Sequence, residues 1–516
     1  MRALLKWLID TRRKTVPQRK SEQAVHSNLG AISPELPVNK AELNRIFSVM
    51  TDLVIREFTV KPSDSQAMIV YLSGLTDLNG LNNNVLYPLM IEGTVDPNPT
   101  QWVSLGNVQT AITWDQVELS ILRGGSVLFI EGRSEAYLLD THGWPQRAIE
   151  DPQIEASLKG AHQGFVETGT QNIAMIRRYI QNRELKSKQM VVGTRGQSFV
   201  TLLYLADVVH PDVLQELEDR ISQVEVDAIL NTGELAEFIE DNPYSPFPQL
   251  MTTERPDAAA SQILQGRIAV VVDRSPGVLI GPATFISFLQ SVDDYSTRWP
   301  IASFIRLLRF IAFFIAVFLP ALYIASISYN IEIIPLKAIL SVGEYRARVP
   351  FPPLLEALLM EITLELLRES GIRLPAPIGQ TVGIVGGIVI GQTAVQAGFV
   401  SNMMVIVVAS TAIASFIIPS FDMVAAIRLI RFPMMLLASM FGVIGIAVGA
   451  MTLIIHLIAL ESLGTPYGSP FAPMRYSDWK DFIIRFPIWT MVTRPKLSRA
   501  IQSRRQGHKR PKGDGK

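Results

Sequence analysis

The chain has no cysteine among its 516 residues, and this absence excludes several kinds of chemistry. Disulfides, thiol nucleophiles and cysteine-ligated metals all need a sulfhydryl group. Common enzyme motifs are missing too: there is no phosphate-binding loop ending in Lys-Ser or Lys-Thr, no His-Glu-x-x-His and no Gly-x-Ser-x-Gly. The six histidines are scattered singly. We therefore expect no enzymatic activity, no metal and no cofactor.

Charge is absent from one long part of the chain. The stretch from Leu374 to Phe421 contains no Asp, Glu, Lys or Arg, and it is long enough for two helices joined near Gly398 to Asn402. Two other apolar stretches, Phe310 to Ile331 and Phe432 to Leu460, can each cross a hydrocarbon core of roughly 30 Å. The apolar residues are concentrated after residue 300. We predict an α+β region of two small subdomains, followed by an α-helical membrane domain.

The predicted domains follow these changes in composition. A loop from Asp241 to Pro256 that holds four prolines divides the soluble part, and the periodicity of Ala41 to Phe58 predicts a helix near its start. The predicted domains are a basic polar leader at 1–40, an α/β subdomain at 41–240, a second small subdomain and linker at 241–300, the membrane domain at 301–462 and a basic tail at 463–516.

Both ends of the chain are basic, with seven Lys or Arg against one acid in residues 1–20 and twelve against three from Arg475 onward. The N-terminal apolar run is broken by charge and lacks a cleavage region, so it is not a secretory signal. Arg298, Arg306 and Arg309 precede the first apolar stretch, which places the soluble part in the cytoplasm by the positive-inside rule. We expect both termini in the cytoplasm and an even number of crossings. These basic ends suit anionic lipid headgroups better than nucleic acid.

A charged segment, Pro352 to Arg373, lies between two of the apolar stretches. Glu356, Glu361 and Glu365 interrupt its Leu-rich and Met-rich sequence, and a lipid-facing span would not carry them. An ordinary surface helix, an interfacial helix and one lining a polar cavity are all compatible with this composition. We favour a re-entrant helix, which gives four to five membrane segments. Arg428 and Arg431 argue against four spans, because they would then lie outside.

Glycine recurs at every fourth position inside the uncharged stretch, which predicts a helix with a smooth packing face. The opposite face carries two glutamines, whose amides would lack partners in lipid at a cost of a few kcal/mol each. That face should therefore contact protein or water. The packing face is Gly379, Gly383, Gly387 and Gly391, and the opposite face is Val385, Val389, Gln392 and Gln396.

The last apolar stretch contains two features of its own. Gly442, Gly445 and Gly449 form a second small-residue face that can pack against another helix. His456 is ionisable, so it is either a proton-relay group or a neutral histidine bonded to a neighbouring helix.

Specific strings carry a resemblance over nearly the whole chain. The run from Pro350 to Glu369 and the run from Ile372 to Gln392 closely resemble the A subunits of GerA-family spore germinant receptors. Further matching strings are Gly164-Phe-Val-Glu167 with Asn172, Arg177 and Arg178, Pro-Gln-Leu-Met-Thr-Thr-Glu-Arg-Pro-Asp at 248–257, and Ser469-Pro-Phe-Ala-Pro473.

This resemblance implies a multi-pass protein of the spore inner membrane. The expected partners are a transporter-like B subunit that senses the nutrient and a lipoprotein C subunit. A subunits of the family are thought to form ring-shaped homo-oligomers, expected to be pentamers, that release monovalent cations when germinant binds. The valine and glutamine face would then line the pore, with valines gating by dewetting and glutamines solvating the ion. Alternatively, it packs on helices of the same subunit.

Two other functions remain open from the sequence. One is a non-conducting membrane scaffold of the same family, such as the SpoVAF-type paralogues. The other is a secondary transporter with a midplane site at the glycine-rich helix, although no inverted repeat is visible. Conductance distinguishes the channel from the scaffold.

Overall fold

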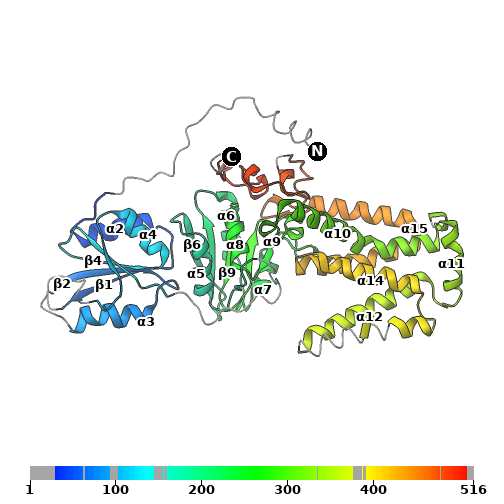
Figure 1. Cartoon of the computed structure of the whole chain (residues 1–516), viewed down its shortest axis with the longest axis horizontal. Helices are drawn as coiled ribbons and strands as arrows, with labels where there is room; N and C mark the ends of the chain where they lie inside the picture. Colours follow the sequence, from blue (N-terminus) through cyan, green and yellow to red (C-terminus); the bar gives the residue numbers. More distant parts are fainter. Residues whose placement is uncertain are drawn as a thin grey trace, which may run out of the picture. The chain divides into compact units, whose positions relative to one another are not determined.

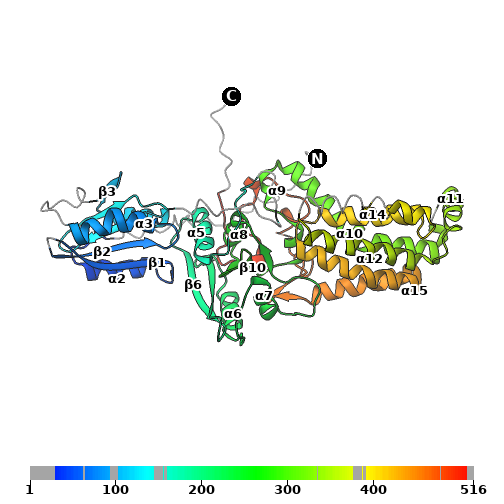
Figure 2. The same cartoon turned by 90° about the horizontal axis from the view of Figure 1, so that it is seen from below.

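The protein is described by a computed structural model covering residues 30–61, 64–92, 103–143, 155, 160–333, 335–375, 386–387, 391–476 and 478–507. The chain forms two compact units, whose elements are labelled in Figures 1 and 2. The first unit comprises Met1–Arg45, Val54–Tyr71 and Leu78–His142, and the second comprises Ile46–Leu53, Leu72–Asp77 and Gly143–Lys516.

The first unit is built on a five-stranded sheet with the order β1-β2-β4-β5-β3. The central strand β4 is buried throughout, and Trp114 of α4 stacks on its Phe129 with ring centroids 5.7 Å apart. The elements are α2 (Leu36–Ile46), β1 (Leu53–Val60), β2 (Ser65–Leu72), α3 (Leu78–Leu81), the π-helical turns η1 (Asn82–Leu86) and η2 (Pro88–Glu92), β3 (Val108–Ala111), α4 (Trp114–Arg123), β4 (Ser126–Ile130) and β5 (Ala136–Leu139).

The helix predicted over Ala41 to Phe58 is only partly confirmed. The helix α2 ends at Ile46, and residues from Leu53 onward form strand β1. Val49, between the two elements, has a left-handed φ of 56°, which a continuous helix cannot contain. The β-branched run that follows then adopts the extended conformation that such side chains favour.

The second unit contains another five-stranded sheet, with the order β6-β7-β9-β10-β8. This sheet takes strands from both sides of residue 240, where the sequence analysis placed a domain boundary. Its elements are α5 (Gly169–Tyr179), β6 (Leu185–Val192), β7 (Ser198–Leu205), α6 (Pro211–Ser222), α7 (Thr232–Ile239), β8 (Met251–Thr253), α8 (Pro256–Ile263), β9 (Ile268–Val272) and β10 (Val278–Gly281).

Helices cover both faces of this second sheet. Side chains of α5 and α8 share one apolar cluster with Ala269 and Val271, whereas α6 and α7 share another with Ile268, Val270 and Val272. Because successive strand residues point to opposite faces, β9 is apolar at every position and fully buried. The α+β prediction for the N-terminal region is confirmed.

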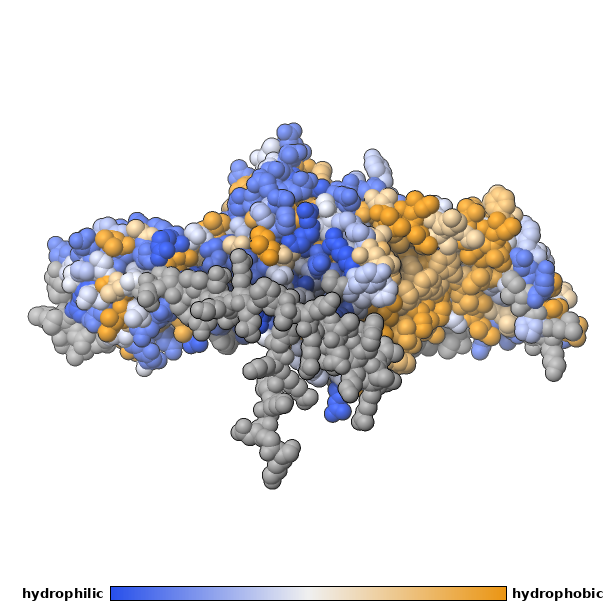
Figure 3. All heavy atoms as spheres, turned by 90° about the horizontal axis from the view of Figure 1, so that it is seen from above, coloured by the Kyte–Doolittle hydropathy of each residue, from blue (hydrophilic) through white to orange (hydrophobic). Residues whose placement is uncertain are grey.

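A helical domain follows the second sheet. Its helices are α10 (Trp299–Ser328), α11 (Leu336–Arg346), α12 (Pro353–Arg373), α14 (Asn402–Ile417) and α15 (Phe421–Ala459). Among the described residues, α10 and α15 are long and apolar enough to cross a membrane, and α14 is a shorter apolar helix. Apolar side chains gather over this domain on the face seen in Figure 3.

The helix α15 is a hairpin rather than one straight rod. Gly442 breaks it with φ 60° and ψ −139°. A Cβ built at Gly449 would lie 2.7 Å from Sδ of Met434, whereas residues fifteen apart in a straight helix are separated by about 22 Å. The single crossing expected from Phe432 to Leu460 is therefore wrong. The small-residue face at Gly445 and Gly449 packs on the first limb of the same hairpin.

The C-terminal tail returns to the second sheet. Tyr467 donates a hydrogen bond to the carbonyl of Pro248 (2.8 Å), and the amide of Ile501 donates to the carbonyl of Val208 (2.9 Å). The remaining short elements of this unit are η4 (Phe285–Leu289), α9 (Asp293–Ser296), η5 (Ile331–Ile333), β11 (Glu461–Ser462), β12 (Thr465–Pro466), η6 (Asp478–Lys480), η7 (Ile488–Thr490) and η8 (Lys496–Ser498).

Candidate functional site: a charged helix in the helical domain

Three glutamates of the helix α12 contact other helices of the helical domain. Glu356 is fully buried and accepts a hydrogen bond from the amide of Ser401, the residue that caps α14, at 2.6 Å. Nη1 of Arg346 lies 3.5 Å from its other oxygen. Glu356 thereby joins α12 to the start of α14 and the end of α11.

Glu361 forms a buried ion pair with Arg431 on the first limb of α15. Their side chains are 2% and 3% exposed, and the Nη1 to Oε2 distance is 2.5 Å. Arg431 also donates to the carbonyl of Ala316 in α10 (2.8 Å) and to the hydroxyl of Ser415 in α14 (3.0 Å). The guanidinium of Arg431 therefore joins α15 to three other helices, α10, α12 and α14. A charge in an apolar interior is tolerated when it is paired and hydrogen-bonded in this way.

A second ion pair lies one helical turn further along. Glu365 accepts from Nη1 of Arg428 at 2.8 Å and from Arg368 at 3.1 Å. Arg368 in turn lies over the ring of Phe416, 5.7 Å from its centroid. Because the pairing partner moves from 431 to 428 as α12 advances from 361 to 365, α12 runs antiparallel to the first limb of α15. Arg428 and Arg431 lie among the helices of the bundle.

The predicted pore and packing faces are only partly described. Val385, Val389, Gly379 and Gly383 lie outside the described residues. Gln392 and Gln396 are exposed on a short helical stretch at 391–396. A Cβ built at Gly387 or Gly391 meets no atom within 4 Å. Gly391 is nevertheless buried, and the role of these glycines in packing stays a prediction.

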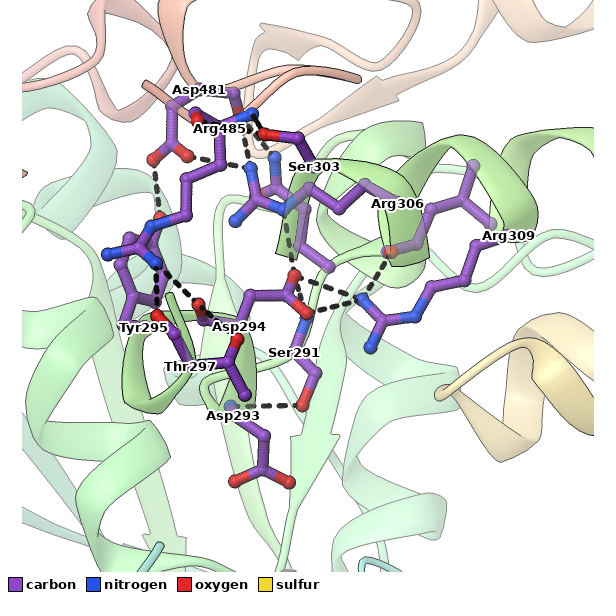
Figure 4. Close-up of polar contacts among 12 residues, drawn as sticks. Ser291, Asp293, Asp294, Tyr295, Thr297, Ser303, Arg306, Arg309, Asp481 and Arg485 are labelled. Carbon is purple, nitrogen blue, oxygen red and sulfur yellow. Dashed lines mark hydrogen bonds and ion pairs between the residues drawn. The ribbon is translucent and has the colours of Figure 1, made fainter. Parts of the chain in front are cut away.

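A second buried charge cluster lies where the second sheet, the start of α10 and the C-terminal tail meet (Figure 4). Asp294 accepts from Nε of Arg306 at 2.8 Å and from Nη1 of Arg309 at 2.9 Å. Arg306 also donates to Asp481 of the tail at 2.7 Å. Arg485 donates to the carbonyl of Asp294 at 2.7 Å. We name these residues and Tyr295 the junction cluster.

Burial shifts the pKa of two groups in the junction cluster. It raises the pKa of Tyr295, whose hydroxyl donates to Asp481, and it lowers the pKa of Arg485. Two arginines of the cluster also lie over the Tyr295 ring. The guanidinium carbon of Arg306 is 5.5 Å from the ring centroid, and that of Arg485 is 4.9 Å from it. From the sequence alone Arg306 is only a topology signal, because its partner Asp481 is far away along the chain.

His456 has a modest structural role. It lies in the last turn of α15, and its Nε2 is 2.9 Å from the hydroxyl of Ser245 in the loop before β8. Its ring lies 6.0 Å from that of Phe247. The histidine therefore bonds to the sheet part of the unit, whereas the sequence analysis proposed either a relay or a bond to a neighbouring helix.

Comparison with known proteins identifies the family. The protein-family model for the Bacillus/Clostridium GerA spore germination protein matches residues 41–497. The chain belongs to the GerA family. The resemblance to spore germinant receptor A subunits is thereby confirmed, and family membership supports a role in spore germination. Together with the two long apolar helices, it also supports a membrane location.

Individual GerA-family relatives are similar over most of their length. The uncharacterized membrane protein YfkQ of Bacillus subtilis is 40% identical, covering 90% of this chain and 91% of its own. Spore germination protein KA of the same species is 39% identical, with coverage of 92% and 89%. Spore germination protein GerLA of Bacillus cereus is 38% identical, with coverage of 86% and 92%.

One solved structure is also similar. The N-terminal domain of the A subunit of the Bacillus megaterium spore germinant receptor GerK3 is 27% identical to this chain. The match covers 50% of this chain and 98% of that domain, with a TM-score of 0.38.

Several residues that carry the GerA-family resemblance serve the fold. The Asn172 side chain accepts from the amide of Val166 (2.8 Å) and donates to the same residue's carbonyl (2.6 Å). Arg177 is 1% exposed and forms a bidentate ion pair with Asp52. Arg177 also donates to the carbonyl of Leu185, so it ties the segment at 46–53 to α5 and β6. These motif residues are explained by buried polar pairing and need no ligand.

Proposed function

We propose that this GerA-family chain is the A subunit of a nutrient germinant receptor in the spore inner membrane, with both termini in the cytoplasm. It oligomerises, as a pentamer in our proposal, into a ligand-gated channel that releases monovalent cations. A transporter-like B subunit binds the germinant, and a lipoprotein C subunit completes the receptor. The chain itself carries no enzymatic activity.

The observation that carries the proposal is the exposed polar surface at Gln392 and Gln396. Both amides lie in a segment that is otherwise free of charge, between helices that suit a membrane. An amide exposed to lipid would lose its hydrogen bonds at a cost of a few kcal/mol. Water in a pore, or a second copy of the chain, would satisfy both side chains.

The charged helix α12 supports this assignment by elimination. Its glutamates Glu356, Glu361 and Glu365 contact Arg346, Arg431 and Arg428, respectively, within the same chain. A pore wall needs polar groups that are free to meet the ion. In the described part of the uncharged stretch, Gln392 and Gln396 are candidates for that role.

The segment that carries the glutamines is held firmly at one end. Gly398 adopts φ +70°, and a Cβ built there would lie 2.9 Å from the carbonyl oxygen of Arg348. Phe399 stacks on Phe351 with ring centroids 6.0 Å apart. The turn after Gln396 is therefore fixed against the loop before α12, which gives the proposed pore face a rigid support.

Cross-linking tests whether the glutamine face meets other copies. The chain lacks cysteine, so Gln396→Cys introduces a single thiol. Oxidation of this variant in liposomes should give covalent dimers in a yield that does not change when the protein is diluted in lipid. The matched control is Phe416→Cys on α14, a position that is 72% exposed, and it should remain monomeric on gels.

Two results would contradict the proposed arrangement. An oligomer of ring size in which Gln396→Cys fails to cross-link would place the glutamines away from the shared axis. A chain that stays monomeric in liposomes, even with its partner subunits present, would contradict the proposed ring-shaped oligomer.

A further inference from the structure

The C-terminal tail exposes large apolar side chains that a water-facing segment rarely shows. Six of them lie between residues 471 and 488, and Tyr476 is 74% exposed. Such a concentration marks an interaction surface. The six residues are Phe471, Met474, Tyr476, Trp479, Ile484 and Ile488.

The tail is fixed at the point where α10 begins. The hydroxyl of Ser303 donates to the carbonyl of Arg485 at 2.9 Å and accepts from the amide of the same residue at 3.1 Å. Arg306, one turn later, is paired with Asp481 (Figure 4). Phe482 is buried in the apolar cluster that also holds Phe313 of α10. The tail therefore lies beside the first turns of a helix that suits a membrane crossing.

A series of aromatic contacts connects the buried Phe482 to the exposed side chains of the tail. Phe482 contacts Phe471 edge to face at 4.7 Å, and Phe471 contacts Trp479 at 6.1 Å. Trp479 then lies 6.2 Å from Tyr476. The exposed rings are thus held in place by packing on one another and on Phe482.

The first turns of α10, which lie beside the tail, also expose apolar side chains. Ile301 is 53% exposed and Phe304 is 60% exposed, and both precede the buried Arg306. Apolar side chains of the tail and of α10 therefore occur together where the helix would enter the bilayer. Trp and Tyr are enriched at this depth because their rings are apolar and their polar tips reach water.

The charge that follows the exposed rings suits a negatively charged surface. Residues 471–488 hold three basic residues against two acids, and nine of the twelve basic residues from Arg475 onward follow this segment, with one acid. Two of those acids are engaged inside the protein: Asp481 pairs with Arg306, and Asp478 accepts from the amide of Lys496 at 3.1 Å. Basic residues beside apolar rings are the combination that binds anionic headgroups.

We propose that residues 471–488 lie in the headgroup region of the membrane that α10 crosses, as an interfacial anchor that binds anionic phospholipid. The anchor fixes the depth of α10 and, through the junction cluster, the distance of the second sheet from the bilayer. This inference needs the membrane location of the chain and is independent of channel activity.

Spin labelling of the full chain in liposomes tests the anchor. A nitroxide on Tyr476→Cys should be accessible to oxygen, which concentrates in lipid, and protected from a water-soluble nickel complex. Two matched controls set the limits. Tyr244→Cys, at a position 96% exposed in the loop before β8, should be open to nickel, and Phe416→Cys on α14 should be the most accessible to oxygen.

Each alternative gives a different result. Nickel accessibility equal to that of the Tyr244→Cys label would overturn the anchor, because the tail would then face water. An immobile label that neither reagent reaches would also overturn it, since another copy or a partner protein would cover the surface. In vesicles of phosphatidylcholine alone, nickel protection should be weaker than in vesicles containing phosphatidylglycerol. Equal protection in both would refute the preference for anionic lipid.

Discussion

Arg431 is a buried charge that joins several helices of the bundle. Its guanidinium pairs with Glu361 of α12 and donates to Ala316 of α10 and Ser415 of α14. In the sequence, Arg431 only argues against a four-span topology. Glu361 is recognisable there as unsuited to lipid, but the pairing joins residues 70 positions apart and no local pattern predicts it.

Replacing Arg431 should destabilise the protein strongly. Arg431→Met leaves the Glu361 carboxylate buried without a partner, which should lower the free energy of unfolding by about 3–5 kcal/mol. The thermal midpoint of the detergent-purified chain measures this. Arg373→Met is the control, because the Arg373–Glu369 pair is 78% and 63% exposed and is worth about 0–1 kcal/mol. The double variant Glu361→Leu/Arg431→Met should regain most of the loss, and equal midpoints for both arginine variants would refute the role of the pair.

At the scale of elements, the hairpin in α15 shows what periodicity cannot reveal. The sequence from Phe421 to Ala459 is apolar enough for one long span. A reversal there needs only a residue that tolerates φ 60° and allows two chains to approach, and Gly442 supplies both. By contrast, β9, α5 and α7 each carry an apolar pattern that is local in the sequence and agrees with the face that is buried.

Gly442 has no room for a side chain. A Cβ there would lie 2.8 Å from Oδ1 of Asn330 and 2.9 Å from Cβ of Tyr329. The positive φ alone costs about 1–3 kcal/mol for another residue, so Gly442→Ala should lower the thermal midpoint. Gly343→Ala is the matched control, since it lies in helix α11 with nothing within 4 Å and should be neutral or slightly stabilising. A hairpin unaffected by Gly442→Ala would mean that the turn lies elsewhere.

At the scale of the whole molecule, the second unit is organised around connections between distant segments. The junction cluster joins α10 to the loop after the second sheet and to the tail, and the charged helix α12 joins the remaining helices. The loop after the second sheet is therefore held to the first turns of α10 by buried ion pairs. The α+β class and the family were accessible from the sequence because strands, apolar runs and motif strings are local. The charge pairs were not, because they form only in three dimensions.

Potassium flux from liposomes tests most directly our proposal that this GerA-family chain forms a cation channel. Val385→Ala shortens the proposed gate, so it should raise the resting flux of an oligomer of ring size above that of wild type. Val448→Ala, the same change at a position 52% exposed on α15, should leave the flux at the wild-type level. Flux that stays at the level of empty liposomes in the Val385→Ala variant, even with the B and C subunits and germinant present, would contradict the channel and favour a non-conducting scaffold.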